Sequence, residues 1–189
     1  MAAILLANAS VLASFSATVD FVGGKAGLTV LADVDGDGRA EILLVELRTN
    51  PMSIAQIADM FISQGVEWTL AIRSFQPGRG YADRPDARIP FTALPHEMAL
   101  DMLHLEADLD GDGRKDLAVR RSLAEIDVFP GREKVWFTEA PAFRLNCPVS
   151  GQLVFRDLNE DRASDIIALD YERRRIGILL SHGAGGKPR

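Results

Sequence analysis

Three short acidic stretches hold the side chains with the clearest capacity for chemistry in this 189-residue chain. They span residues 33–41, 108–116 and 157–165 and are called loop 1, loop 2 and loop 3 below. In loops 1 and 2, carboxylates stand at positions 1, 3, 5 and 9. Hard divalent cations take about six to eight oxygen ligands, and Ca²⁺ accepts irregular geometry. The spacing therefore predicts a Ca²⁺ site in each of these two loops.

The backbone carbonyl at position 7 would add one more oxygen, and the glycine at position 6 permits the sharp turn that such a loop needs. Loop 3 departs from the pattern, because Asn159 replaces the second carboxylate and Arg162 replaces that glycine. Metal binding by loop 3 therefore stays open. Mg²⁺ is disfavoured, since it demands stricter octahedral geometry. The candidate metal ligands are Asp33, Asp35, Asp37, Arg39, Glu41, Asp108, Asp110, Asp112, Arg114, Asp116, Asp157, Asn159, Asp161, Ala163 and Asp165.

An EF-hand is the first alternative for such loops. Its calcium loop needs a bidentate glutamate at position 12 and a helix on each side. Position 12 is held here by Leu44, Val119 and Ala168, which offer no side-chain oxygen. The flanks are short apolar runs bounded by loop residues, a pattern typical of buried strands. These runs lie at 28–31, 42–45, 117–119, 153–155 and 166–169.

A strand, a nine-residue acidic loop and a second strand thus recur three times, which indicates an internal repeat. The pattern resembles the FG-GAP/VCBS repeat of integrin-α-like β-propellers. The likeness is to the bacterial VCBS type, because the Phe-Gly and Gly-Ala-Pro signatures of the integrin form are missing from the sequence. Residues 32–45 and 107–119 carry the match, and residues 156–169 carry it more weakly. In that family each loop joins two strands of one blade and binds Ca²⁺.

The resemblance implies an all-β fold of propeller-type blades, each a four-stranded antiparallel sheet. The loop starts lie 75 residues apart (33 to 108) and then 49 residues apart (108 to 157). One blade takes about 40 to 60 residues, so we expect about three blades. Closed propellers have about four to eight, so the ring is incomplete. The chain is then the C-terminal part of a longer protein, which we favour, a subunit that completes its ring by association, or an open array.

The repeat region is expected over residues 20–181, with distinct segments around and within it. Residues 48–65 form an insert whose helical spacing of apolar residues, Asn-Pro start and final glycine predict a short helix at about 52–63. Residues 1–19 are apolar and small, and fit either a secretory signal peptide that lacks a basic n-region or strands that end a preceding blade. Residues 182–189 are predicted to be a flexible tail.

Further along the chain, the sequence predicts additional strands and the environment of the single cysteine. Residues 126–129 and 135–137 are expected to pair as a hairpin, and prolines mark an edge strand near 87–91. Cys147 cannot form an intrachain disulfide and is expected to be a small buried hydrophobe. No segment has the length and apolarity of a membrane-spanning helix.

Charge and the missing catalytic motifs narrow the classes of function. A net charge of −6 and a pI near 5.1 argue against a nucleic-acid partner, since phosphate backbones bind basic surfaces. The sequence has three histidines, at 96, 104 and 182, and no metalloprotease, nucleophile-elbow or phosphate-loop motif. We therefore expect no catalysis by this chain.

The sequence thus favours a non-enzymatic calcium-binding β-propeller repeat module with a structural or protein/glycan-interaction role. Weak sites that need about 0.1–1 mM Ca²⁺ suit extracellular modules, so the expected location is extracellular, periplasmic or at the cell surface. The expected partners are calcium, a protein or glycan ligand, and the missing blades. Alternatives are an accessory segment of a larger extracellular hydrolase or lyase and a lectin-like carbohydrate binder, with Trp68, Arg79, Tyr81 and Arg84 as candidate contact residues.

Overall fold

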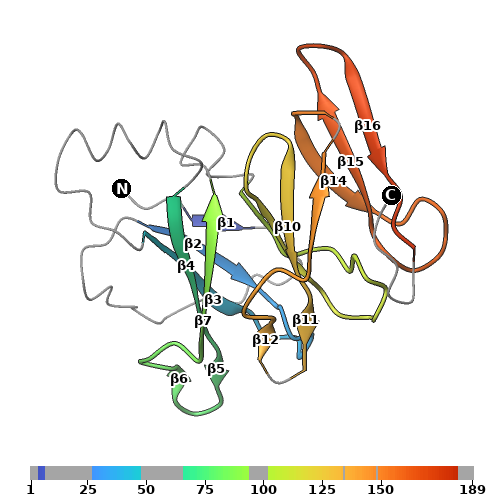
Figure 1. Ribbon diagram of the computed structural model, residues 1–189. Helices are drawn as coiled ribbons and strands as arrows, with labels where there is room; N and C mark the ends of the chain where they lie inside the picture. Colours follow the sequence, from blue (N-terminus) through green and yellow to red (C-terminus); the bar gives the residue numbers. More distant parts are fainter. Residues whose placement is uncertain are drawn as a thin grey trace, which may run out of the picture.

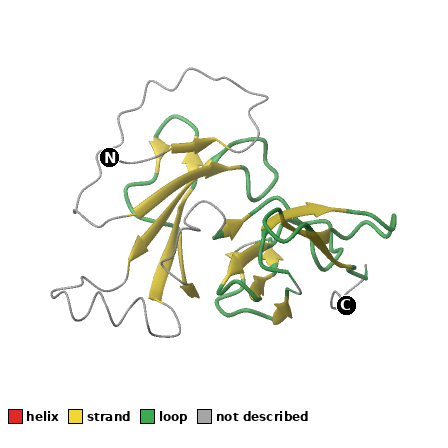
Figure 2. Cartoon of the chain, turned by 90° about the horizontal axis from the view of Figure 1, so that it is seen from above, coloured by secondary structure: helices red, strands yellow, loops and turns green. Residues whose placement is uncertain are grey.

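The computed structural model describes residues 4–6, 27–47, 66–93, 102–133, 135–147 and 149–182. Every secondary-structure element assigned in these residues is a β-strand (Figures 1 and 2), so the prediction of an all-β fold is confirmed. The sheets of this part of the chain do not join into a closed ring (Figure 1). The helix predicted at about 52–63 lies outside the described residues, as do most of segment 1–19 and the tail after residue 182.

The first sheet contains the two strands that loop 1 joins, and its strand order is β1-β2-β3-β4-β7. All neighbours pair antiparallel except β1 and β2, which are parallel. A two-stranded hairpin, β5–β6, is inserted between β4 and β7. The strands are β1 (Ile4–Leu6), β2 (Gly27–Ala32), β3 (Glu41–Leu47), β4 (Val66–Arg73), β5 (Phe75–Gln76), β6 (Gly80–Tyr81) and β7 (Ala87–Ala93).

The second sheet contains the two strands that loop 2 joins. Its strand order is β13-β10-β9-β8, with all pairs antiparallel. A small hairpin, β11–β12, is inserted between β10 and β13. The hairpin predicted from 126–129 and 135–137 is therefore wrong, because β10 pairs with β9 and β13 instead. The strands are β8 (Leu103–His104), β9 (Leu117–Arg120), β10 (Glu125–Phe129), β11 (Gly131–Arg132), β12 (Trp136–Phe137) and β13 (Phe143–Asn146).

The third sheet contains the two strands that loop 3 joins, β14 (Gln152–Arg156) and β15 (Asp165–Asp170), together with β16 (Arg175–Leu179). Its pairs are antiparallel. The first two sheets each contain the predicted set of four antiparallel strands, whereas the described part of the third has three. Each acidic loop joins two adjacent antiparallel strands, as expected: β2 to β3, β8 to β9, and β14 to β15.

Strand β7 illustrates why these residues form strands. Ile89, Phe91 and Ala93 are buried at alternate positions, while Arg88 and Pro90, on either side of Ile89, are exposed, which is the two-residue period of a half-buried strand. Proline lacks the backbone N–H that a central strand needs, so Pro90 suits an edge position. The predicted edge strand is confirmed, since β7 pairs only with β4.

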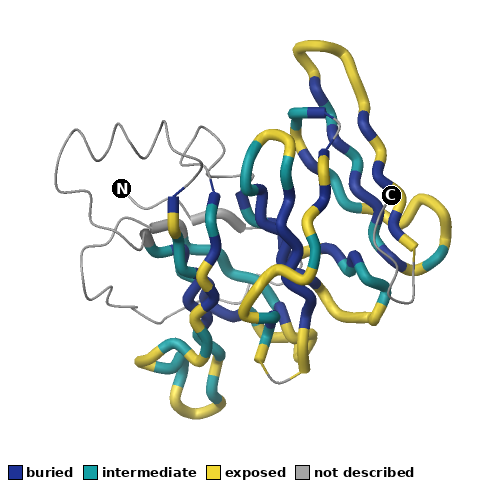
Figure 3. Tube along the Cα trace, in the orientation of Figure 1, coloured by how far each residue is buried: buried dark blue, intermediate teal, exposed yellow. Residues whose placement is uncertain are grey.

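Two apolar clusters hold the three sheets together, and their buried segments are dark blue in Figure 3. The first cluster joins the first and second sheets, with Leu43 and Leu70 on one side and Val119 and Phe129 on the other. The second cluster joins the second and third sheets and includes the Cys147 side chain, which confirms its predicted burial. Because successive strand residues face opposite sides, β9 contributes to both clusters.

Candidate metal centre

The three loops share one set of five hydrogen bonds from backbone N–H groups to side chains. The side-chain carboxylate at position 1 accepts hydrogen bonds from the backbone N–H groups of positions 4 and 6. The side-chain oxygen at position 3 accepts one from the N–H of position 5, and that at position 5 accepts one from the N–H of position 7. The carboxylate at position 9 accepts from position 2. The donor–acceptor distances are 2.7 to 3.1 Å. Short-range bonds of this kind stabilise turns, so each loop is shaped by its own nine residues.

The backbone takes a positive φ angle at positions 4 and 6 of every loop. Glycines occupy both positions in loops 1 and 2, with φ from 74° to 88°. In loop 3, Glu160 (φ 62°) and Arg162 (φ 74°) adopt the same conformation. A side chain at positive φ is sterically costly, because Cβ approaches the backbone carbonyl. The departure noted at Arg162 therefore leaves the loop shape intact and adds strain.

Loop 1 gathers three carboxylates at its surface. Oxygens of Asp33, Asp35 and Asp37 all lie within 4.8 Å of one another. Glu41, at position 9, turns inward instead: it is 2% exposed and accepts the Val34 N–H bond. Burial raises the pKa of Glu41 to about 7; the Val34 bond opposes this rise and the charges of the three aspartates add to it. A cation at the aspartates would relieve this repulsion.

Loop 2 gathers a different and more buried set of carboxylates. Oxygens of Asp108, Asp110 and Asp116 lie within 4.8 Å of one another. Asp116 has no exposed surface and accepts N–H bonds from Leu109 at 2.7 Å and Gly131 at 2.8 Å. Burial nevertheless raises its pKa to about 6, and the charges of Asp110 and Asp108 contribute. The cluster thus places two half-buried carboxylates beside a fully buried one, where solvent screens their charges only in part.

The fourth carboxylate of loop 2, Asp112, faces two arginines. Its Oδ2 lies 3.7 Å from a guanidinium nitrogen of Arg114 and 3.7 Å from one of Arg132. Arg114 also approaches Glu133 at 3.7 Å. In loop 1 the corresponding pair, Arg39 and Asp37, is 4.0 Å apart and exposed. Surface ion pairs of this kind are weak and easily rearranged, so they compete little with a bound ion.

Loop 3 compensates its acidic residues with its own donors. The Asn159 amide nitrogen donates to Asp161 Oδ2 at 3.0 Å and to the Ser181 carbonyl at 3.3 Å. Asp165, which is fully buried, accepts three hydrogen bonds, from the Leu158 N–H and from the N–H and hydroxyl of Ser181. Among the described residues, loop 3 forms no cluster of three carboxylates like those of loops 1 and 2. Loop 3 thus has an amide that donates to Asp161 at the position where loops 1 and 2 have a further carboxylate.

The three loops lie next to one another along one edge of the stacked sheets. The side chain at position 8 of loop 2, Lys115, donates to the Asp33 carbonyl, at position 1 of loop 1, at 3.2 Å. The N–H of Ser164, at position 8 of loop 3, donates to the Asp108 carbonyl, at position 1 of loop 2. Loops 2 and 3 therefore each contact the preceding loop through the same two positions, by a side chain in loop 2 and by a backbone N–H in loop 3.

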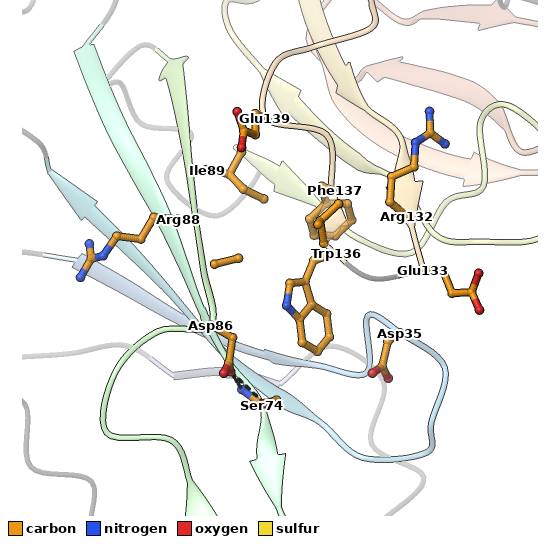
Figure 4. Close-up of a pocket in the computed structure, with 12 residues that line it drawn as sticks. Asp35, Ser74, Asp86, Arg88, Ile89, Arg132, Glu133, Trp136, Phe137 and Glu139 are labelled. Carbon is orange, nitrogen blue, oxygen red and sulfur yellow. Dashed lines mark hydrogen bonds between the residues drawn. The ribbon is translucent and has the colours of Figure 1, made fainter.

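A cleft of about 520 Å³ opens beside loop 1, between β7 and the β11–β12 hairpin (Figure 4). Asp35 and the half-buried indole of Trp136 line it. Trp136 has a φ of 66°, a strained conformation for a bulky residue. Of the remaining lining residues, Ser74, Asp86, Arg88, Arg132, Glu133 and Glu139 are polar, and Ala87, Ile89, Val135 and Phe137 are apolar.

Two of the predicted contact residues have structural roles. The Trp68 ring packs against the first core cluster and donates to the Ala93 carbonyl at 3.3 Å. The Tyr81 hydroxyl donates to the Ala40 carbonyl at 2.9 Å and so supports loop 1. Neither residue lines the cleft.

Several supporting residues were not expected from the sequence. Gly131 and Ser181 bond to position-9 carboxylates from 15 and 16 residues away, and Arg132 faces Asp112. The fold requires glycine at position 131, because a Cβ there would collide with the Lys115 carbonyl.

No protein-family model and no curated protein matches this chain. The resemblance to VCBS-type repeats therefore stays a prediction that rests on the loop pattern. Within the described residues there is also no helix of the length and apolarity needed to cross a membrane.

Proposed function

We propose that the chain is a non-enzymatic calcium-binding β-repeat module, in which loops 1 and 2 bind Ca²⁺. The observation that carries the proposal is the pair of three-carboxylate clusters, each within 4.8 Å and each on the same hydrogen-bonded loop. The expected ligands are Asp33, Asp35 and Asp37 in loop 1, and Asp108, Asp110 and Asp116 in loop 2. The carbonyls of Arg39 and Arg114, and water, would complete the oxygen shell of a hard cation.

Arg39 and Arg114 belong to this proposal only through their backbone carbonyls. We propose that loop 3 binds no metal, because the Asn159 amide donor replaces the cation there. The three stacked sheets then serve as a propeller-type scaffold whose loops a cation makes rigid. A site of this kind suits calcium-rich surroundings, so the proposed place is outside the cytoplasm, in a secreted or cell-surface protein.

The test is thermal unfolding of the chain in EDTA, in Ca²⁺ and in Mg²⁺, together with calorimetric titration of Ca²⁺. We expect a higher melting temperature in Ca²⁺, a smaller effect of Mg²⁺, and two sites. The sharpest variants are Asp35→Asn and Asp110→Asn, which give loops 1 and 2 the amide that loop 3 already carries at position 3. The double variant should fold and bind no Ca²⁺.

Loop 3 provides a matched control and a gain-of-function test. Asp161→Asn, at position 5 of loop 3, should leave the stoichiometry of two unchanged. The variant Asn159→Asp with Arg162→Gly gives loop 3 the position-3 carboxylate and the position-6 glycine of loops 1 and 2 and should create a third site. Absence of any Ca²⁺-dependent shift or heat in the wild-type chain would refute the proposed function.

The cleft supports a second candidate function, ligand recognition. An indole beside carboxylates and arginines is a common surface for polar ligands with one apolar face, such as sugars. Tryptophan fluorescence during titration with a glycan panel tests this candidate, since Trp136 lines the cleft and Trp68 does not. A fluorescence change that is lost in Trp136→Phe and kept in Trp68→Phe would support binding there. No response to any glycan would count against a lectin-like role.

A further inference from the structure

Loops 1 and 2 are each held at their first residue by the loop that follows in the chain. That residue is Asp33 in loop 1 and Asp108 in loop 2, and its carboxylate both shapes the loop and belongs to the acidic cluster. Position 8 of the following loop bonds to the backbone of this aspartate in both cases. The two supports differ in kind, because Ser164 is half-buried and Lys115 is exposed.

Ser164 of loop 3 fixes both backbone polar groups of Asp108. The Asp108 N–H donates to the Ser164 hydroxyl at 3.2 Å, and the Ser164 N–H donates to the Asp108 carbonyl. On either side, the Ala107 carbonyl accepts the Asp116 N–H at 2.6 Å, and the Leu109 N–H donates to the Asp116 carboxylate at 2.7 Å. Every backbone polar group from the Ala107 carbonyl to the Leu109 N–H is therefore paired, which fixes the start of loop 2.

Packing reinforces the hold of each loop on the one before it. Leu109, at position 2 of loop 2, is fully buried in the second core cluster, which also contains Ile166 from the strand after loop 3. Val34, at position 2 of loop 1, is 7% exposed in the first cluster, which contains Leu117 from the strand after loop 2. Leu158, at position 2 of loop 3, is 45% exposed instead. Loops 1 and 2 are thus each anchored in a core shared with the next unit.

The polar support of loop 1 is an exposed side chain. Lys115, at position 8 of loop 2, donates from its ammonium group to the Asp33 carbonyl at 3.2 Å. A lysine side chain has many rotamers, and holding it in one of them costs free energy. The Lys115 bond therefore restrains Asp33 less than the two Ser164 bonds restrain Asp108.

Lys115 stands between two groups that are proposed to bind calcium in loop 2. Arg114, at position 7, would offer its backbone carbonyl, and Asp116, at position 9, has its carboxylate in the acidic cluster. An ion bound there would fix the backbone on both sides of Lys115. Its side chain would then lose less conformational freedom when it bonds to Asp33, and a site that is already ordered binds its ligand more tightly.

We propose that position 8 of one loop positions the first calcium ligand of the preceding loop, so that loop 2 binds Ca²⁺ before loop 1 and its occupation tightens binding at loop 1. Ser164 is the positioning residue for loop 2, and Lys115 is the positioning residue for loop 1. Loop 3, without a metal of its own, thereby supports the neighbouring site. This order and this coupling rest on the proposed function, calcium binding by loops 1 and 2.

Two effects of opposite sign act between the sites. Coupling through an ordered contact is typically about 5- to 150-fold in affinity, and a single exposed bond should give about fivefold. Repulsion between the two ions opposes binding of the second, and so does repulsion between the Lys115 ammonium and an ion in loop 1. Salt at about 0.15 M weakens such repulsion at exposed sites. The sign of the measured coupling therefore decides between positioning and repulsion.

Calorimetric titration of Ca²⁺ in about 0.15 M KCl measures the order and the coupling. Asp35→Asn leaves the loop 2 site and Asp110→Asn leaves the loop 1 site, and loop 2 alone should bind several-fold more tightly. The wild-type chain should bind its second ion about fivefold more tightly than Asp110→Asn binds its only ion. Two equal and independent sites, or a second ion bound more weakly than in Asp110→Asn, overturn the inference but not the proposed function. No calcium binding by the wild-type chain overturns both.

Variants of Lys115 separate positioning from charge. Lys115→Met removes the donor and keeps a long side chain, so the second ion should bind only as tightly as in Asp110→Asn. Loss of positive charge alone would instead tighten loop 1. Lys115→Arg keeps a cationic donor and should keep most of the coupling. Arg121→Met, in the turn between β9 and β10, is the matched control and should behave like wild type. Wild-type coupling or a tighter second ion in Lys115→Met overturns the role of Lys115.

Ser164→Ala tests the support of loop 2 in the Asp35→Asn background. It removes the acceptor of the Asp108 N–H, so the calcium affinity of loop 2 should fall about threefold or more. Ser164→Thr keeps a hydroxyl and should restore the affinity. The same alanine change in the Asp110→Asn background should leave loop 1 unchanged. If Ser164→Ala does not fold by circular dichroism, Ser164→Cys replaces it as a weaker acceptor of similar size. Unchanged affinity of loop 2 in the folded variant overturns the role of Ser164.

Discussion

Replacing Asp110 by asparagine should have opposite effects on stability in the absence and in the presence of calcium. Its Oδ1 accepts the Asp112 N–H at 3.1 Å, and Asn159 Oδ1 accepts the Asp161 N–H at 3.1 Å at the same place in loop 3. An amide oxygen can therefore keep the turn. The change removes one negative charge from a group whose pKa is raised by burial and by the charges of Asp112 and Asp108.

The size of each effect follows from the cluster. The substitution removes the charge repulsion of Asp110 with Asp108 and with Asp116, whose oxygens all lie within 4.8 Å of one another. The repulsion of each pair destabilises the fold by about 1 kcal/mol even with the screening of water. The metal-free variant should therefore be about 1–2 kcal/mol more stable than wild type. A site with a Kd near 0.1 mM contributes about 2.7 kcal/mol at about 10 mM Ca²⁺. Loss of that contribution should make the variant about 1 kcal/mol less stable than wild type in calcium.

The assay is urea unfolding of both proteins in EDTA and in Ca²⁺, followed by circular dichroism. The calcium-induced gain in the free energy of unfolding should fall by about 2.7 kcal/mol in Asp110→Asn, which for a chain of this size is about 5–11 °C in melting temperature. Ser150→Ala, which lies outside all three loops, is a control for nonspecific effects. Equal destabilisation of Asp110→Asn in both buffers would show that the carboxylate is structural, and the reasoning from charge repulsion would fail.

Three further predictions concern pH and backbone geometry. The folded protein holds the Glu41 pKa near 7, above its ordinary 4.5, so the folded state binds more protons in this window; metal-free stability should fall from pH 4.5 to 7 in urea unfolding with EDTA, and a rise would contradict this. Gly131→Ala should cost about 1–3 kcal/mol through the clash with the Lys115 carbonyl, measured by urea unfolding against Ser150→Ala. Arg162→Gly should stabilise the chain by about 1 kcal/mol by removing a strained positive φ, whereas Arg156→Gly, on a strand, should destabilise it.

The interior of each acidic loop could be predicted from the sequence because its interactions are local. The carboxylate at position 1 reaches N–H groups three and five residues away, and glycines supply the positive φ angles. The flanking strands could also be predicted, since short apolar runs bounded by loop residues, such as 42–45 and 166–169, are typical of buried strands. The candidate ligands therefore followed from spacing, and the all-β class from these strand patterns together with the resemblance to β-propeller repeats.

Only the tertiary structure decided which acids converge and what surrounds them. Sequence spacing treats position 9 alike in the three loops, but Asp116 joins a cluster, Glu41 turns inward and Asp165 bonds to Ser181 from a distant turn. The sequence did not determine the strand partners either. Residues 126–129 pair with β9 and β13 and not with the nearby residues 135–137.

The reason is physical. Hydrogen bonds within nine residues depend on the order of a few side chains. The pairing of strands and the burial of a face depend on which apolar surfaces, far apart in the chain, exclude water together. Thus the residues of the loops determined where a cation would be attracted. The stacking of the sheets decided that Asp116 and Glu41 are buried beside it and that Ile176 and Ile178 remain exposed on the outer face of the third sheet.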